Sequence, residues 1–182
     1  MSEMTTRDVI IDVARKLFAE RGFTLTTIRD VAEAADVSPA LVMKLTGSKA
    51  ELFQAAAPEA PRVEDLDHPS EPLGCRMVRA LVERRDSGDF EYWAMAPFIL
   101  QEAPDREAAR EKMMAGFVPR IAAAIGDESA GRVRSRLVVT LMLGLASGLR
   151  TFEIVTPDVI DSSSLVETYG ALVQNVIDND EL

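Results

Sequence analysis

The sequence predicts an all-α fold, and three observations lead to that prediction. Apolar residues recur at spacings of three and four along almost the whole chain, helix-start signals are frequent, and the alternation typical of strands is scarce. With 182 residues, 47% of them hydrophobic and 27% charged, the chain has the composition of a globular protein with one domain or two small ones.

The first predicted helix ends at Gly22. Its apolar residues Val9, Val13 and Leu17 lie on one line of the helix surface. Because glycine tolerates a positive φ, Gly22 can turn the chain sharply, and Phe23 can then pack back on Phe18.

Three further short helices follow, each with a start signal. Thr27 and Asp30 form a capping box, as do Ser48 and Glu51, since each places a hydroxyl residue three positions before a carboxylate. Between them, Ser38 caps a helix that has proline at its first position, where the missing N–H costs nothing. The predicted ranges are a second helix from 27, a third over 39–45 that stops at Gly47, and a fourth over 49–57.

Composition changes between residues 58 and 72, where four prolines and several acids occur with little periodicity. We expect a linker here, and therefore two domains, 1–55 and 56–182. Five more helices are predicted downstream, over 73–86, 89–102, 105–125 with a kink at Pro119, 129–155 and 163–178.

Charge is distributed unevenly over these two parts. Residues 1–55 hold 7 Lys/Arg and 8 Asp/Glu, whereas residues 56–182 hold 13 and 22, within a total net charge of −10. Global charge therefore argues against nonspecific coating of nucleic acid, although the near-neutral first part permits a local nucleic-acid surface.

The composition gives little support to an enzyme. One cysteine and one histidine leave no internal disulfide, no usual metal cluster and no nucleophile–histidine pair, and there is no phosphate-binding glycine loop. We expect no cofactor and no metal. The longest uncharged apolar stretch has 13 residues, too short to span a bilayer, and no signal peptide is evident, so we expect a cytoplasmic protein without a membrane partner.

The first three helices make a helix-turn-helix candidate, because the second and third are joined by a turn of about four residues. In such a pair the second helix must be short and capped so that its N-terminal end can enter the major groove. Taken alone this pattern is a weak signal, since most capped helix pairs are packing units.

The order of residues is far more specific. The stretch over 17–53, LFAERGFTLTTIRDVAEAADVSPALVMKLTGSKAELF, resembles the DNA-binding domain of the bacterial tetracycline-repressor (TetR) family of transcription regulators. The resemblance extends without a gap from Leu17-Phe18 and Gly22-Phe23, through Thr26 to Ala32, to Ser48 to Leu52. The acidic helical region downstream also fits that family, which implies a C-terminal helical ligand-binding and dimerisation domain.

The resemblance implies roles for individual residues. Thr27 would contact a phosphate, Arg29 a base or the backbone, and Lys49 the backbone; Ser38, Pro39, Ala40 and Leu41 would form the leading edge in the major groove. With three neighbours, the candidate DNA-binding residues are Thr27, Arg29, Ser38, Pro39, Ala40, Leu41, Met43, Lys44, Ser48 and Lys49. Alternatively, Arg29 is a solvated surface charge, and Ser38 and Ser48 act first as caps.

Three positions depart from the family pattern. Met43 stands where a tyrosine is usual, and Leu45 and Thr46 stand where His-Phe is common. Met43 has no hydroxyl to donate to a phosphate, and the third helix begins without polar base readers, so apolar contacts and shape would dominate readout. These departures motivate an alternative: an all-helical module that binds a small molecule or a protein and has lost DNA binding.

Aromatic residues and methionines gather between residues 90 and 117, beginning with Phe90. Such a set could line an effector pocket, although a stripe of this kind is more often ordinary core. The candidate effector-binding residues are Tyr92, Trp93, Met95, Phe98, Met113 and Phe117.

The last two predicted helices are more apolar around their circumference than a monomer's surface helices should be, and they carry small residues that let another helix approach. They favour a four-helix homodimer interface over burial within a monomer. The candidate interface residues are Leu141, Gly144, Leu145, Gly148, Tyr169, Leu172, Val173 and Val176. The leading hypothesis is a dimeric regulator, most simply a repressor released from its double-stranded DNA operator by a small-molecule effector.

Overall fold

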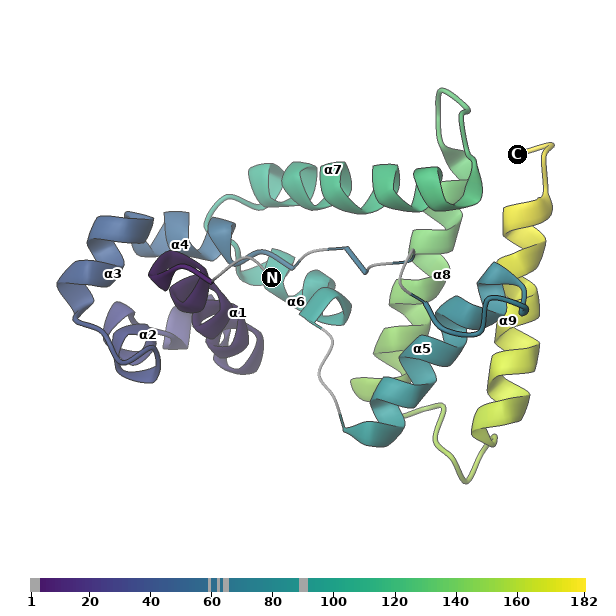
Figure 1. Cartoon of the computed structure of the whole chain (residues 1–182), viewed down its shortest axis with the longest axis horizontal. Helices are drawn as coiled ribbons and strands as arrows, with labels where there is room; N and C mark the ends of the chain where they lie inside the picture. Colours follow the sequence, from purple (N-terminus) through teal and green to yellow (C-terminus); the bar gives the residue numbers. More distant parts are fainter. Residues whose placement is uncertain (1–3, 59, 62, 64–65, 89–91) are drawn as a thin grey trace. The chain divides into compact units, whose positions relative to one another are not determined.

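A computed structural model describes residues 4–58, 60–61, 63, 66–88 and 92–182 of the chain. These residues form nine α-helices and one 3₁₀ helix and include no strand, which confirms the all-α prediction (Figure 1). The chain divides into two compact units. The N-terminal unit contains residues up to 59 together with Met95–Met113, and the C-terminal unit contains Ala60–Ala94 together with Met114–Leu182.

The N-terminal unit is built from the first four helices, α6 and the start of α7. Their bounds are α1 Thr6–Leu25, α2 Ile28–Ala34, α3 Pro39–Thr46, α4 Lys49–Ala55, α6 Ala96–Glu102 and α7 Arg106–Ile125. One apolar core contains residues from all of the first four helices, α1, α2, α3 and α4, and from α6. Its fully buried members are Ile10, Ala14, Val31, Val42 and Leu52.

The predicted turn at Gly22 is present, with a φ of 77° at a break inside α1. Beyond it Phe23 stacks on Phe18, the ring centroids being 6.1 Å apart, and both rings meet Phe53 edge-on at 5.0 and 4.9 Å. Edge-to-face pairs of this kind add stability beyond the area that they bury. The three rings therefore join the parts of α1 on either side of Gly22 to α4.

Glu102, the last residue of α6, is bound to the same turn. Its carboxylate accepts a hydrogen bond of 2.6 Å from the Phe23 N–H. A Cβ atom added at Gly22 would overlap this carboxylate. The backbone angle therefore favours glycine at position 22, and a larger residue there would also displace the Glu102 carboxylate.

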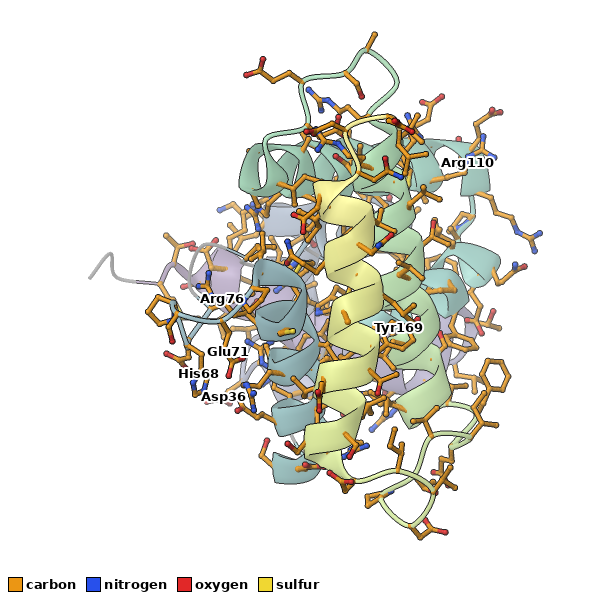
Figure 2. All side chains as sticks on the ribbon, turned by 90° about the vertical axis from the view of Figure 1, so that its right-hand side faces the viewer. Asp36, His68, Glu71, Arg76, Arg110 and Tyr169 are labelled. Atoms are coloured by element: carbon orange, nitrogen blue, oxygen red, sulfur yellow. The ribbon has the colours of Figure 1, made fainter. Side chains whose placement is uncertain are left out.

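The C-terminal unit contains α5 (Leu73–Ser87), α8 (Val133–Arg150), α9 (Ser162–Asp178) and the second part of α7, and Figure 2 shows α9 beside both α5 and α8. Two glycines let α5 and α9 come close. A Cβ atom at Gly74 would lie 2.5 Å from the backbone nitrogen of Gln174, and one at Gly170 would lie 2.7 Å from the Cα atom of Cys75. Gly170 is therefore a point of close approach between α9 and α5 of the same chain.

Several helix bounds differ from those predicted. The single helix expected over 89–102 is a 3₁₀ helix, Tyr92–Met95, followed by α6; residues 89–91 lie outside the described part of the chain. The helix expected over 129–155 extends only over Val133–Arg150, because Glu153 adopts a positive φ of 49° and the turn after Arg150 folds back on Gly148. Pro119 lies inside α7, which continues on both sides of it. No helix in the described residues is both long and apolar enough to cross a bilayer.

Asp127 holds the start of α8. The residue at the capping position, Arg132, has a left-handed backbone and provides no side-chain cap. Instead, the buried Asp127 carboxylate accepts hydrogen bonds from the Ser135 N–H at 3.0 Å and hydroxyl at 2.5 Å, and from the Ser129 N–H and hydroxyl at 3.2 and 2.7 Å. The Ser135 hydroxyl is the main cause of a pKa of Asp127 well below its ordinary value.

We expect Asp127→Ala to lower the free energy of unfolding by about 1–3 kcal/mol at neutral pH, because four donors lose their acceptor and two of them are backbone groups. The folded-state pKa is lowered, so this contribution is complete above the unfolded-state pKa and declines as pH falls below about 4. Urea denaturation from pH 7 downward measures both effects. Glu128→Ala, at the exposed neighbour, is the matched control, and an equal loss in both variants would contradict the assignment.

We expect Gly22→Ala to destabilise the N-terminal unit by about 1–3 kcal/mol, since alanine at a positive φ is strained and Glu102 must swing away from the Phe23 N–H. Gly116→Ala provides the control. Gly116 lies inside α7 with open space around it, so alanine there should be neutral or stabilising by up to about 1 kcal/mol. Thermal unfolding compares the two, and a Tm unchanged by Gly22→Ala would contradict this preference.

Candidate nucleic-acid interface and ligand cavities

The helix pair α2 and α3 is joined by a four-residue turn, residues 35–38. Asp36 takes a left-handed φ of 52°, and the Val37 N–H then donates back to the Ala32 carbonyl at 2.9 Å. Aspartate tolerates this backbone better than most residues. The turn is thereby fixed by backbone hydrogen bonds, and it sets the direction in which α3 leaves α2.

The two faces of α3 have different surroundings. Val42 and Thr46 are buried against the core, while Ser38, Pro39, Ala40, Met43 and Lys44 are exposed and Leu41 is half-buried. The Thr46 hydroxyl donates to the Val42 carbonyl at 2.8 Å, which satisfies this buried polar group within the helix. Thr46 is the last residue of α3 and stands where the family pattern has an aromatic residue. Leu45 packs against the core beside it.

Hydroxyl caps hold the N-termini of α2, α3 and α4. The Ser38 oxygen accepts from the Leu41 N–H at 3.2 Å, and both predicted capping boxes are formed. In the first box, the Thr27 hydroxyl donates to Asp30 at 2.7 Å, and this bond is the main cause of a lowered pKa at that carboxyl. The three N-termini are exposed at their capping residues, so their remaining N–H groups can meet an anion.

Basic side chains surround these helix ends. Arg29 and Lys44 are exposed, and the Lys49 ammonium lies 4.3 Å from the centroid of the Phe23 ring and 3.5 Å from the Thr24 carbonyl. A cation–π contact of this geometry orients the lysine without removing its charge. Arg7, which sequence reasoning missed, donates to the Leu45 carbonyl near the C-terminus of α3 at 3.3 Å. No local signal marks this contact, because its partners are 38 positions apart.

The six candidate effector residues are divided between the two units. Met95, Phe98 and Met113 belong to the N-terminal unit, and the first two line a cavity of about 250 Å³ together with Phe18 and Phe53. Tyr92, Trp93 and Phe117 belong to the C-terminal unit, where Trp93 and Phe117 are buried.

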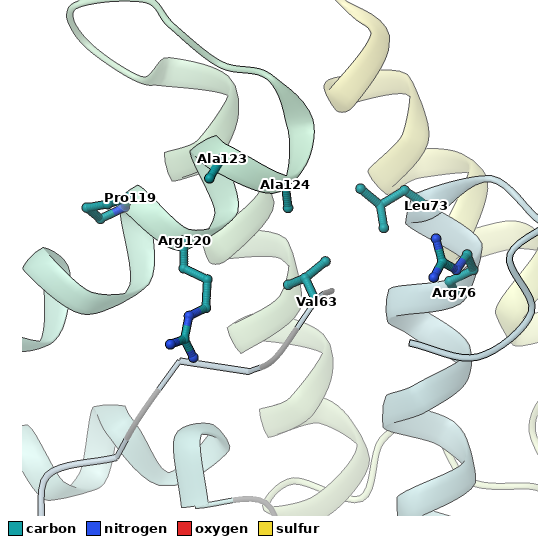
Figure 3. Close-up of a pocket in the computed structure, with 7 residues that line it drawn as sticks. All are labelled: Val63, Leu73, Arg76, Pro119, Arg120, Ala123 and Ala124. Carbon is teal, nitrogen blue, oxygen red and sulfur yellow. The ribbon is translucent and has the colours of Figure 1, made fainter. Parts of the chain in front are cut away.

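Two neighbouring cavities are described here within the C-terminal unit. The larger, about 710 Å³, is drawn in Figure 3 and contains none of the candidate effector residues; its walls are Val63, Leu73, Arg76, Pro119, Arg120, Ala123 and Ala124. The smaller, about 30 Å³, is bounded by Trp93 among others, and Val63 forms a wall of both. Trp93 is only 7% exposed, and its indole N–H has no hydrogen-bond partner among the described residues. No local sequence pattern predicts that Arg76 and Arg120 line the same cavity, because they belong to two helices, α5 and α7, that are far apart in the sequence.

The candidate interface residues on α8 and α9 differ in burial. Leu145, Gly148 and Val173 are buried within the chain itself, and the Tyr169 hydroxyl donates to the Leu141 carbonyl at 3.0 Å, which ties α9 to α8. The members that face solvent wholly or in part are Leu141, Gly144, Tyr169, Leu172 and Val176. Beyond Gly144 the space is open.

Among the described residues, no group of three or more His, Cys, Asp or Glu side chains is placed to bind a metal ion. The features that indicate a function are a capped helix-turn-helix with basic side chains at its exposed ends and a second helical unit that contains cavities. This combination defines a DNA-binding regulator rather than a coat protein for nucleic acid.

Family comparisons agree with that class. Residues 10–56 match the model of the TetR-family bacterial regulatory proteins, and residues 71–177 match the tetracycline-repressor-like C-terminal domain. The protein belongs to the TetR family of DNA-binding transcriptional regulators.

Solved structures share the fold. A TetR-family regulator from Streptomyces coelicolor is 27% identical, with 96% of this chain and 95% of that chain covered at a TM-score of 0.59. NalD of Pseudomonas aeruginosa, the secondary repressor of a multidrug efflux pump, is 21% identical, with 90% and 94% covered at a TM-score of 0.54. A search of curated protein sequences gave no match.

Proposed function

We propose that this protein is a repressor that binds its operator as a homodimer and leaves the DNA when a small-molecule effector occupies its C-terminal unit. The DNA-binding class follows from the family, in which operator binding, dimerisation and effector release are typical. The residues that carry each step, and repression itself, are our proposal. A bacterial regulator meets its operator in the cytoplasm, and we propose that location.

One observation supports the DNA-binding surface most strongly. α3 buries Val42 and Thr46 on one side, and it exposes its other side together with its capped N-terminal residues. We propose that this side enters the major groove. Its exposed atoms are mainly apolar, so methyl contacts with thymine and the fit to groove shape would contribute most of the sequence preference. Of its side chains, only Lys44 is charged.

Arg29, Lys49 and the N-termini of α2 and α4 would hold the phosphates on either side. The Thr27 hydroxyl proton is already donated to Asp30, so a phosphate beside Thr27 would meet backbone N–H groups. Lys49 keeps its charge on the Phe23 ring and has one carbonyl contact, which leaves donors for a phosphate.

Selection of bound DNA from a random pool tests DNA recognition and yields the operator. On that operator, we expect Arg29→Ala and Lys49→Ala each to weaken binding and to reduce the salt slope by about one, because each removes one phosphate contact. Arg110→Ala is the control, since Arg110 is exposed in the same unit and pairs with Glu107 at 3.3 Å. Binding and salt slopes unchanged in both test variants would rule out this surface.

Dimerisation is supported by apolar side chains on α8 and α9 that the chain does not bury. Val133 and Leu137 are exposed one turn apart on α8, followed by Leu141 and Gly144 near the same line, and Leu172 is 53% exposed on α9. A second copy would cover these residues through a two-fold interface. Its symmetry would then set the spacing of the operator half-sites.

We expect Leu172→Glu to convert the dimer to a monomer, because a buried unpaired carboxylate at a two-fold interface occurs twice and is costly. Sedimentation equilibrium at micromolar concentration measures the change from twice the chain mass of 19.9 kDa to that mass itself. Leu25→Glu, at an exposed leucine of the N-terminal unit, should leave the mass unchanged. A monomeric parent protein would refute the dimer.

The effector site is supported by the cavities of the C-terminal unit. A volume of about 710 Å³ lies within the range of small-molecule sites, and Trp93 offers an unpartnered buried donor at the adjoining smaller cavity. An effector acts by binding better to one arrangement of the DNA-binding units than to another. A gel-shift assay on the selected operator, with and without ligand, measures that coupling.

A further inference from the structure

We propose that Lys44 reads a guanine in the major groove, so that each operator half-site contains one guanine beside base pairs whose thymine methyl groups meet the apolar side chains of α3. This inference rests on the proposed function, because it assigns a base to the DNA-binding surface and names the residue that recognises it.

Lys44 lies on the line of α3 that is farthest from the core. Helix α3 packs against α1, α2 and α4 (Figure 1). Consecutive residues of a helix are rotated by about 100°, so Ala40 and Lys44, four positions apart, share one line of its surface. Val42 and Thr46, each two positions from Lys44, lie on the opposite side and are buried, whereas Ala40 and Lys44 are exposed. When the exposed side enters the groove, Lys44 is therefore near its centre.

The path from Lys44 to the N-terminal end of α3 is open. A helical side chain extends back over the preceding turn, so the Lys44 side chain runs over Ala40. Alanine adds only a methyl group there. The ammonium group can therefore reach the end of α3 that comes nearest to the base edges.

Lys44 keeps all of its donors within the described part of the chain. Two other basic side chains near it are engaged: the Lys49 ammonium lies over the Phe23 ring, and Arg7 donates to a main-chain carbonyl at the C-terminus of α3. Lys44 has neither a hydrogen bond nor an ion pair among the described residues. Arg29 has none either, but it belongs to α2, which lies outside the groove in this arrangement.

The capping carboxylates of the same surface do not neutralise Lys44. Asp30 and Glu51 are both bound within their capping boxes. The Thr27 hydroxyl is the main cause of the lowered pKa of Asp30, and the Ser48 N–H is the main cause of the lowered pKa of Glu51. Lys44 contributes to neither shift, so its positive charge is directed to no carboxylate of these boxes.

Guanine is the base whose major-groove edge suits a lysine best. It presents two acceptors, O6 and N7, whereas adenine presents N7 beside an amino donor, thymine O4 beside a methyl group, and cytosine an amino donor. An ammonium group has three donors and no acceptor, so it gains most from guanine. Ala40 and Met43, the neighbours of Lys44 on the exposed side, carry apolar groups that suit thymine methyls.

The first test uses the unaltered full chain and the operator selected from a random pool. Each guanine is replaced in turn by 7-deazaguanine, which pairs normally but lacks the N7 acceptor. We expect one guanine in each half-site to weaken binding by about fivefold or more when it is replaced, the effect of losing part of a good base contact. The same replacement should have no effect on Lys44→Ala, because that variant lacks the reader. Gel shifts measure both.

The second test repeats the selection with variants. Lys44→Gln should change the selected base at that position from guanine to adenine, because glutamine pairs with N6 and N7 of adenine, and Lys44→Arg should retain guanine. Arg29→Ala and Lys49→Ala are the matched controls. They remove proposed phosphate contacts, so they should select the same sequence with lower affinity.

The inference is wrong if the selected half-site contains no guanine, or if no guanine responds to the loss of N7. Both results come from the unaltered protein, so the folding of a variant does not affect them. It is also wrong if Lys44→Ala weakens binding to all sequences equally and selects an unchanged site, which is the behaviour of a phosphate contact. DNA binding would stand in each of these cases. Failure of the full chain to select any DNA would instead contradict the proposed function.

Discussion

The three packed rings of Phe18, Phe23 and Phe53 are the interaction on which the DNA-binding unit depends. They bring together the parts of α1 before and after its break at Gly22 and the second half of α4, and the edge-on contacts help to fix the angles between these segments. Phe23 has two further partners: Lys49 lies over its ring, and Glu102 accepts from its N–H. A single aromatic residue thus connects the core, a basic side chain at the proposed phosphate surface and the end of α6.

Gly22 makes this arrangement accessible, because only a residue that tolerates a positive φ can return Phe23 onto Phe18 beneath the Glu102 carboxylate. The turn between α2 and α3 depends on a similar device at Asp36. α3 follows the second of these turns and buries Val42 and Thr46. It can therefore leave most of its N-terminal residues exposed, which is what a helix that reads a groove requires.

The C-terminal unit is rich in acidic residues, but two arginines line its larger cavity. Arg76 and Arg120 donate to main-chain carbonyls, as Arg136 does, while Arg79 and Arg134 pair with carboxylates. Arg76 and Arg120 therefore contribute both to the cavity wall and to hydrogen bonds with the carbonyls of Ala60, Leu66 and Asp67.

Local signals determined much of this protein from its sequence alone. The caps at Thr27, Ser38 and Ser48 and the break at Gly22 are short-range effects of backbone chemistry, so the sequence indicated the helix-turn-helix and the all-α class. Contacts between distant residues were decided only by the tertiary structure. The aromatic residues and methionines expected to line one pocket are divided between the two units, Gly170 serves close packing with α5, and arginines 44 positions apart line the cavity. Periodicity reports that a residue is buried, but its partner depends on how helices pack, and that is a property of the whole chain.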